Sequence, residues 1–292
     1  MFFEIKNEYL RVKVASKGAE LWSILANDGT EYLWQGDGKY WPDRALNIFP
    51  FVGRLTNGLY EMDGVQYPLN IHGFSWTSEF TLAEQTDTRL VLELCDSEET
   101  YAQYPRKFCF RVIYELCGKV IKYVYEVENR DSRTMYFGLG GHPGFNVPLV
   151  AGKKHEDYRL RFAEAAPAER VGFAPSCLMD GTFAPFALKD GTILDLRHDL
   201  YDDDAIVLQN MCREVTLEAP GESHYVRVSY PQMPYLGIWH APKTDAPYVC
   251  IEPWMSLPST EGEVAVLEQK SDILQLDAGK TYRNEWEIEI GF

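Results

Sequence analysis

Apolar and polar residues alternate with a period of two along much of the chain. The clearest runs are Arg89–Cys95, Phe108–Leu116, Val120–Glu128, Tyr158–Phe162, Glu214–Glu218, Tyr225–Tyr230 and Glu285–Ile290. Successive side chains of a strand point to opposite faces of its sheet, so most of these runs place their apolar residues largely on one face. The pattern predicts antiparallel strands with one face buried and the other in water.

Turn-forming residues separate these runs, and no long segment repeats its apolar residues every 3.6 positions. We therefore expect helix to be short and sparse. Neither a linker nor an internal repeat divides the chain, so residues 1–292 are expected to form one domain, a single large antiparallel β-sandwich. The turn signals are Asn27-Asp28-Gly29, Asp63-Gly64, Asp180-Gly181, Asp190-Gly191 and Ala278-Gly279. The pair Asp63-Gly64 lies between two short apolar runs and predicts a β-hairpin.

Composition narrows the possible partners. Aromatic residues make up 14% of the 292 residues, which favours a sheet protein. The formal net charge is −16. A surface this acidic repels phosphate backbones, so we expect no nucleic-acid partner. The acidic surface also argues against a strongly anionic substrate, unless a local arginine binds that substrate.

The cysteines and the N-terminal segment indicate a compartment. No C-x-x-C pair occurs, so neither a zinc knuckle nor a thioredoxin-like site is expected. The start MFFEIKNEYL does not read as a signal peptide, and no run approaches 18 apolar residues. We expect a cytoplasmic protein that does not span a membrane, with reduced and mostly buried cysteines. The cysteines are Cys95, Cys109, Cys117, Cys177, Cys212 and Cys250.

Four segments interrupt the strand pattern with Gly, Pro and polar residues. They are Asn47–Arg54, Ile71–Phe74, Gly140–Asn146 and Cys250–Trp254. We expect them to form loops, and loops on a rigid sheet are where functional residues gather.

Two of these segments carry groups suited to proton transfer. His142 lies in a Gly-Gly-His-Pro-Gly run, where it is either a general acid or a residue that caps a turn. Glu252 follows an apolar pair at the end of a buried-looking strand. It is either a general base whose pKa is raised by burial or one half of an ion pair with an arginine.

The other candidates have weaker local signals. His72, before Gly73, is either functional or a structural turn residue. Arg54 is either a solvated surface residue or a binding group, because its guanidinium offers a planar fork of donors suited to vicinal hydroxyls or a carboxylate. We expect His155 to lie in a solvated loop. His240 is expected to have a strand-end role, beside a Trp239 that could form a pocket wall.

Taken in order, the four segments resemble one family. They read Gly53-Arg54, His72-Gly-Phe74, Gly141-His-Pro-Gly-Phe-Asn146 and Glu252-Pro-Trp254. This order resembles the aldose 1-epimerase (galactose mutarotase-like) family, above all the bacterial branch found beside lactose-utilisation genes. The resemblance extends over essentially the whole chain, and Gly-His-Pro-Gly-Phe-Asn is its most specific part.

The resemblance implies a β-supersandwich that binds a sugar in an open cleft, with no cofactor and no metal. Glu252 would remove the proton of the anomeric hydroxyl, His142 would protonate the ring oxygen, and His72 would assist near that oxygen. The sugar-binding residues would be Arg54, Asp204 (chosen from Asp202-Asp203-Asp204), Asn146 and Trp239. Trp254 and Phe145 are further candidates for the cleft wall. The family's usual second arginine is missing, because Gly58 follows Asn57.

Three other functions are weighed against this one. A non-haem iron site needs two His and a carboxylate, but neither His72 nor His142 has an acidic residue at the usual close spacing. A sugar-binding or sensing protein would bind the sugar in the same cleft without catalysing its conversion. A hexose-phosphate mutarotase would need basic residues at the cleft, for which Lys153-Lys154 is available. The sugar, galactose or glucose, and the oligomeric state are left open.

Overall fold

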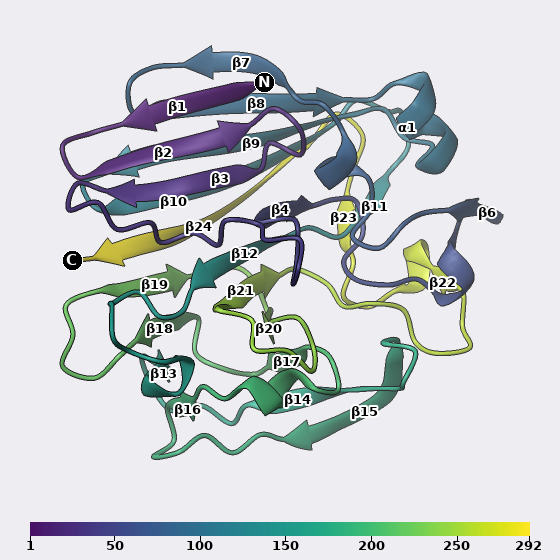
Figure 1. Ribbon diagram of the computed structural model, residues 1–292. Helices are drawn as coiled ribbons and strands as arrows, with labels where there is room; N and C mark the ends of the chain where they lie inside the picture. Colours follow the sequence, from purple (N-terminus) through teal and green to yellow (C-terminus); the bar gives the residue numbers. More distant parts are fainter.

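The computed structural model describes residues 1–292 and consists mainly of β-strands (Figure 1). The largest sheet has nine antiparallel strands. In spatial order they are β16 (Ile193–Asp195), β13 (Arg159–Phe162), β18 (Glu214–Glu218), β19 (Tyr225–Ser229), β24 (Thr281–Gly291), β10 (Val120–Asn129), β9 (Phe108–Cys117), β8 (Arg89–Cys95) and β7 (Thr81–Gln85). Strand β24, yellow in Figure 1, runs between β10 and β19 and so joins early and late parts of the chain in one sheet.

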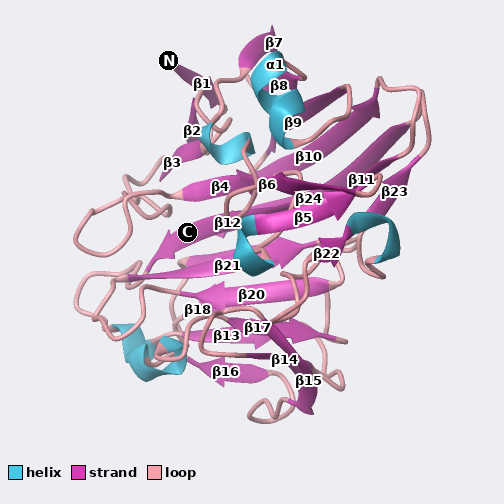
Figure 2. Cartoon of the chain, turned by 90° about the vertical axis from the view of Figure 1, so that its right-hand side faces the viewer, coloured by secondary structure: helices cyan, strands magenta, loops and turns pink.

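A second sheet of seven antiparallel strands carries His142, Trp239 and Glu252. Figure 2 shows β4, β12, β21 and β20 side by side across the middle of the molecule. In spatial order the strands are β15 (Met179–Pro185), β14 (Glu169–Phe173), β17 (Ile206–Gln209), β20 (Tyr235–Trp239), β21 (Tyr248–Trp254), β12 (Gly140–Asn146) and β4 (Ala45–Ile48).

Three small sheets and a few short helices complete the fold. The sheets are β1 (Phe2–Lys6), β2 (Leu10–Ala15) and β3 (Leu21–Ala26); β11 (Met135–Phe137) and β23 (Leu274–Leu276); and β22 (Ala265–Val266), β5 (Leu59–Met62) and β6 (Val65–Pro68). Among the paired strands, β22 and β5 are parallel. The helices are α1 (Glu98–Gln103) and the 3₁₀ turns η1 (Thr56–Gly58), η2 (Ser75–Thr77), η3 (His155–Asp157), η4 (His198–Tyr201) and η5 (Leu267–Gln269). No helix has the length and apolar character needed to cross a membrane.

The core is continuous between the two large sheets. One cluster of 63 buried residues draws side chains from both, including Tyr125 and Trp286 of the first sheet and Phe145 and Ile251 of the second. Removing this apolar surface from water is the main driving force for the fold. The all-β architecture with little helix is as predicted.

The amphipathic runs became strands with nearly the predicted bounds. Residues 89–95 and 214–218 match β8 and β18 from end to end, and the 108–116 and 120–128 runs are each one residue shorter than β9 and β10. The hairpin at Asp63-Gly64 is also confirmed. Both residues have positive φ, +54° and +74°, as a two-residue turn of this kind requires.

Three predictions of irregular structure are wrong. Residues 140–146 form strand β12, and residues 250–254 belong to strand β21. Both strands are buried on both faces, so they lack the alternation that marks a half-exposed strand. The pair Asp180-Gly181 lies inside β15. The cysteines are also less buried than expected, since Cys117 is exposed and Cys95 and Cys177 are half-buried.

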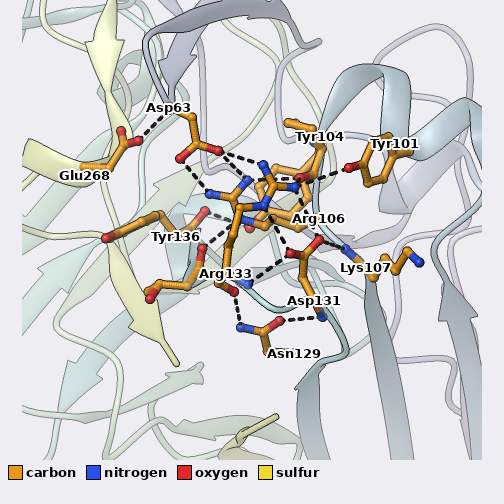
Figure 3. Close-up of polar contacts among 12 residues, drawn as sticks. Asp63, Tyr101, Tyr104, Arg106, Lys107, Asn129, Asp131, Arg133, Tyr136 and Glu268 are labelled. Atoms are coloured by element: carbon orange, nitrogen blue, oxygen red, sulfur yellow. Dashed lines mark hydrogen bonds and ion pairs between the residues drawn. The ribbon is translucent and has the colours of Figure 1, made fainter. Parts of the chain in front are cut away.

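A polar network fastens the β5–β6 hairpin to the start of β9 (Figure 3). The guanidinium of Arg106, only 1% exposed, donates to both carboxylate oxygens of Asp63 at 2.8 and 3.1 Å. Its Nε donates to the main-chain oxygen of Thr134, and Arg133 reaches the same Asp63 carboxylate at 3.0 Å. These charge-assisted bonds compensate for the cost of burying a cation.

Candidate functional site

A cavity of about 240 Å³ opens on the face of the seven-stranded sheet that points away from the core. Side-chain alternation explains how the sheet forms both surfaces. Ile251 belongs to the core cluster, and a Cβ on Gly141 would meet the core residue Trp286, while His142 and Glu252 line the cavity. The cavity is lined by Trp41, Asp43, Leu46, Gly53, Arg54, Ile71, His72, Trp76, His142, Phe173, Cys177, Asp204, Ala205, Val207, Trp239, Glu252, Trp254 and Pro258.

His142 and Glu252 face each other across two neighbouring strands. The register that pairs Gly140 with Trp254 and Gly144 with Cys250 places His142 of β12 opposite Glu252 of β21. His142 Nε2 lies 3.2 Å from Glu252 Oε2, and the residues are 8% and 1% exposed. The two groups can therefore exchange a proton directly.

Glycines create the space in which this pair lies. A Cβ on Gly140 would lie 2.7 Å from the Trp254 ring and 2.9 Å from the oxygen of Pro253, so a larger residue would push β12 away from β21. Gly237 of β20 is paired with Glu252 on the other side, and a Cβ there would lie 3.2 Å from Glu252 Cβ. The Gly-rich sequence around His142 thus allows strands to approach closely rather than forming a loop.

His72 is held in a reciprocal contact with Gly53. Its main-chain N–H donates to the oxygen of Gly53 at 3.0 Å, and its Nδ1 accepts from the N–H of Gly53 at 3.2 Å. Because Nδ1 accepts, the neutral ring carries its proton on Nε2. The His72 ring lies edge-on to that of His142, with 5.5 Å between centroids. A donor nitrogen is therefore fixed beside the pair.

Three of the four expected sugar-binding residues also line the cavity. Trp239 Nε1 donates to Asp204 Oδ1 at 2.9 Å, which joins an aromatic wall to a carboxylate. Of the three adjacent aspartates, Asp204 is the one that lines this cavity. Arg54 lies after Gly53 and brings a guanidinium to the cavity wall.

Asn146 lies elsewhere, and so does Phe145. The side-chain amide of Asn146 donates to the main-chain oxygens of Glu31 and Leu33 at 2.9 and 3.0 Å, so it fastens a neighbouring segment to β12. Asn146 is the last residue of β12, two alternations away from His142, and it does not line the cavity. Phe145 is fully buried in the main core.

Several lining residues were not anticipated, notably Trp41, Trp76, Asp43 and Cys177. The Trp41 ring lies 4.9 Å from that of His142 and 5.6 Å from that of Trp239. Trp41 and Trp76 both lie in segments without apolar periodicity, where the sequence predicts no strand that could bury a large aromatic side chain. A tryptophan in such a segment is the sequence signal that could have identified them.

Burial governs the proton affinities of the site. It raises the pKa of Glu252 well above its usual range, and the nearby Asp204 carboxylate adds to the rise. Burial lowers the pKa of His142 to about 4. It also lowers the pKa of His72, helped by His142 and Arg54. The pair therefore holds one proton near neutrality, while Glu252 Oε1 and His142 Nδ1 make no hydrogen bond to the protein.

The same place offers three atoms of the kinds that bind metals. Cys250 precedes Glu252 by two residues, and its sulfur lies within 4.8 Å of ligand atoms of both His142 and Glu252. Burial, with a contribution from Glu252, raises the pKa of this thiol well above its usual range. A thiol that stays protonated is a poor metal ligand, so these residues suit proton transfer better than metal binding.

Comparison with known proteins gives consistent results over the whole chain. A family model described as aldose 1-epimerase matches residues 1–285. The chromosomal LacX protein of Lactococcus lactis subsp. lactis is 34% identical over 298 residues, covering 99% of this chain and 99% of LacX. The plasmid-encoded LacX protein of the same organism matches at the same identity and coverage.

Solved structures show the same fold at comparable identity. A galactose mutarotase related enzyme from Lactobacillus acidophilus superposes with a TM-score of 0.93 at 32% identity, covering 99% of this chain and 97% of that one. A galactose mutarotase-like protein from Lactobacillus casei gives a TM-score of 0.94 at 30% identity, covering 99% and 100%.

Proposed function

Because the chain belongs to the aldose 1-epimerase family, we propose that it interconverts the α and β anomers of a free hexose such as galactose or glucose. The observation that carries this proposal is the buried pair of His142 and Glu252, 3.2 Å apart on the wall of a cavity. Anomer exchange needs one group that accepts a proton and one that donates it, and this pair supplies both.

The reaction begins with the pair in its charge-separated form. Glu252 accepts the proton of the anomeric hydroxyl, and protonated His142 donates to the ring oxygen as the bond from that oxygen to C1 breaks. The products are an open-chain aldehyde, a protonated Glu252 and a neutral His142, so the pair still holds one proton. Rotation about the C1–C2 bond presents the other carbonyl face, and the reverse transfers close the ring as the opposite anomer.

The remaining cavity residues bind and orient the sugar. His72 donates from Nε2 near the ring oxygen, because its Nδ1 is occupied by Gly53. Arg54 and Asp204 bind hydroxyl groups, with Asp204 oriented by Trp239. The rings of Trp41 and Trp239 lie edge-to-face and provide apolar surface for a sugar face. No cofactor takes part in these steps.

The cavity favours a free sugar over a sugar phosphate. Lys153, considered above as a phosphate ligand, forms an ion pair with Glu222 at 3.0 Å, and neither Lys153 nor Lys154 lines the cavity. Arg54 is the one guanidinium on its wall, and besides Glu252 two further carboxyl groups, those of Asp43 and Asp204, line it too. A phosphate would therefore meet one cation and three acidic groups.

Polarimetry tests the proposal and ranks the substrates. Freshly dissolved α-galactose, α-glucose and α-glucose 6-phosphate are followed with and without the protein. We expect faster rotation change for at least one free hexose than for the phosphate. If all three sugars relax at the buffer rate while one of them binds the protein, the chain is a sugar-binding protein and the catalytic proposal fails.

A further inference from the structure

Three histidines meet outside the cavity. His155 begins η3, His198 begins η4, and His240 follows the last residue of β20. One ring nitrogen from each lies within 4.8 Å of the other two. None of the three lines the cavity. The expectation that His155 lies in a solvated loop is wrong, because the residue is 4% exposed.

Two of the rings hydrogen-bond each other. His240 Nδ1 donates to the oxygen of Ala241 at 2.8 Å, so its Nε2 carries the lone pair and accepts from His198 Nδ1 at 3.2 Å. A bound ion would replace this one hydrogen bond, with the His198 proton moving to Nε2. The His155 ring stacks on that of His198 with 4.1 Å between centroids. Neither nitrogen of His155 makes a hydrogen bond to the protein. A buried imidazole without a partner is costly to keep, which indicates a partner for it outside the chain.

We propose that His155, His198 and His240 bind a zinc ion. In a tetrahedral site with Zn–N bonds of ~2.0–2.1 Å, two ligand nitrogens lie ~3.3 Å apart, close to the 3.2 Å between His198 Nδ1 and His240 Nε2. His155 gives up no hydrogen bond when its ring turns out of the stack to complete the site. Three imidazoles leave a fourth position for water or a carboxylate.

The surroundings of the ligands resemble those of known zinc sites. Histidine ligands commonly donate their second ring N–H to a carboxylate or a main-chain oxygen. His240 donates to Ala241 in this way, and His198 Nε2 lies 3.8 Å from the carboxylate of Glu156, next to His155. The first contact keeps the lone pair of His240 on Nε2, and the second places an acceptor near the nitrogen of His198 that would carry the proton when Nδ1 binds the ion.

The ion would connect three segments that are far apart in the chain. It would fasten η3 and η4 to the end of β20 at His240. The residue before His240 is Trp239, which is hydrogen-bonded to Asp204, three residues after the end of η4. The site would thus rigidify one wall of the cavity while taking no part in proton transfer.

The test is a zinc titration of chelator-treated protein against a competing chromogenic dye. We expect one tightly bound equivalent in the wild type. His155→Phe keeps a buried ring without a ligand atom, and His198→Ala changes a partly exposed position, so at least one variant should fold. We expect each to lower the zinc affinity by ~100-fold or more. His224→Ala, at a histidine that pairs with Asp28 and does not belong to the cluster, is the control and should bind as the wild type does.

Two further readouts distinguish this site from thiol sites elsewhere. Zinc should raise the melting temperature of the wild type but not that of His155→Phe. Cobalt bound in place of zinc should give visible bands of tetrahedral coordination without a thiolate charge-transfer band. No zinc binding by the wild type, or binding that both variants retain, would overturn the proposal.

Discussion

The protonation states of His142 and Glu252 depend on each other. Burial disfavours a charge on either residue, which raises the pKa of Glu252 and lowers that of His142. Both shifts favour the form in which Glu252 holds the shared proton, and at 3.2 Å that proton can pass directly to His142. The hydroxyl groups of a bound sugar would stabilise the charge-separated form from which the proposed reaction starts.

Replacing His142 tests the acid. His142→Asn keeps a polar side chain but cannot hold a proton, so we expect anomer exchange to slow by about 10²-fold or more. The matched control is His224→Asn, at a position that does not line the cavity, which should leave the rate unchanged. A change of less than about threefold in His142→Asn would show that this histidine is structural.

At the scale of elements, the sequence predicts those strands that have one solvent-exposed face. β8, β9, β10 and β18 follow from alternation, whereas β12 and β21, which carry the pair, do not, because both of their faces are buried. The glycines of β12 read as a loop, yet they serve close strand packing against Trp254 and Trp286. The same burial that hides these strands from pattern analysis produces the shifted pKa values.

The turn at Gly53 gives a prediction about how His72 is positioned. Gly53 has φ +71°, and a Cβ would lie 2.4 Å from Pro258 Cγ. Gly118 has a similar φ of +61° with nothing within 4 Å of a Cβ. Gly118→Ala should therefore cost only the left-handed strain of about 1–2 kcal/mol. Gly53→Ala should cost more in urea unfolding and should also impair exchange, since it displaces His72. Equal costs would contradict this account.

The network in Figure 3 gives a second prediction for an element. Asp63→Asn preserves a side chain that tolerates φ +54°, but it leaves Arg106 buried without its anionic partner. We expect a loss of about 2–3 kcal/mol in the free energy of unfolding. Asp195→Asn, which breaks an exposed pair with Lys189, should cost less than about 1 kcal/mol. A loss at Asp63 no larger than at Asp195 would contradict a structural role for the network.

That loss should itself depend on pH. The hydrogen bond from Arg106 holds the pKa of Asp63 below its usual range, so the carboxylate stabilises the folded state above the unfolded-state pKa. The stabilisation disappears as pH falls through the folded-state pKa. The difference between wild type and Asp63→Asn should therefore shrink in acid.

At the scale of the whole molecule, one core joins the two large sheets. The sequence indicates the class of fold, but it does not show which residues far apart in the chain come into contact. The histidines at 155, 198 and 240 carry no motif in the sequence, and long-range packing alone brings them together. Asn146 stood in the most specific part of the family pattern, yet its side chain donates hydrogen bonds to main-chain oxygens outside the cavity.

A single domain over residues 1–292 stays a prediction, which coincident unfolding transitions by two probes would support.

Burying an ionisable Glu252 should weaken the whole fold. Its pKa is raised, so the folded state binds a proton that the unfolded state has lost at neutral pH. Stability should consequently fall as pH rises from the unfolded-state pKa toward the folded one. Glu252→Gln removes this cost, and we expect it to melt higher than the wild type near pH 7 but not near pH 4. A variant that melts lower at both pH values would contradict this expectation.

The most direct test of the central claim is magnetisation transfer between the α and β anomer signals of equilibrated galactose or glucose. Wild-type protein should accelerate exchange, and Glu252→Gln should abolish the acceleration while remaining folded and still binding the sugar. Exchange at a near-wild-type rate in Glu252→Gln would remove Glu252 from the mechanism and contradict the account.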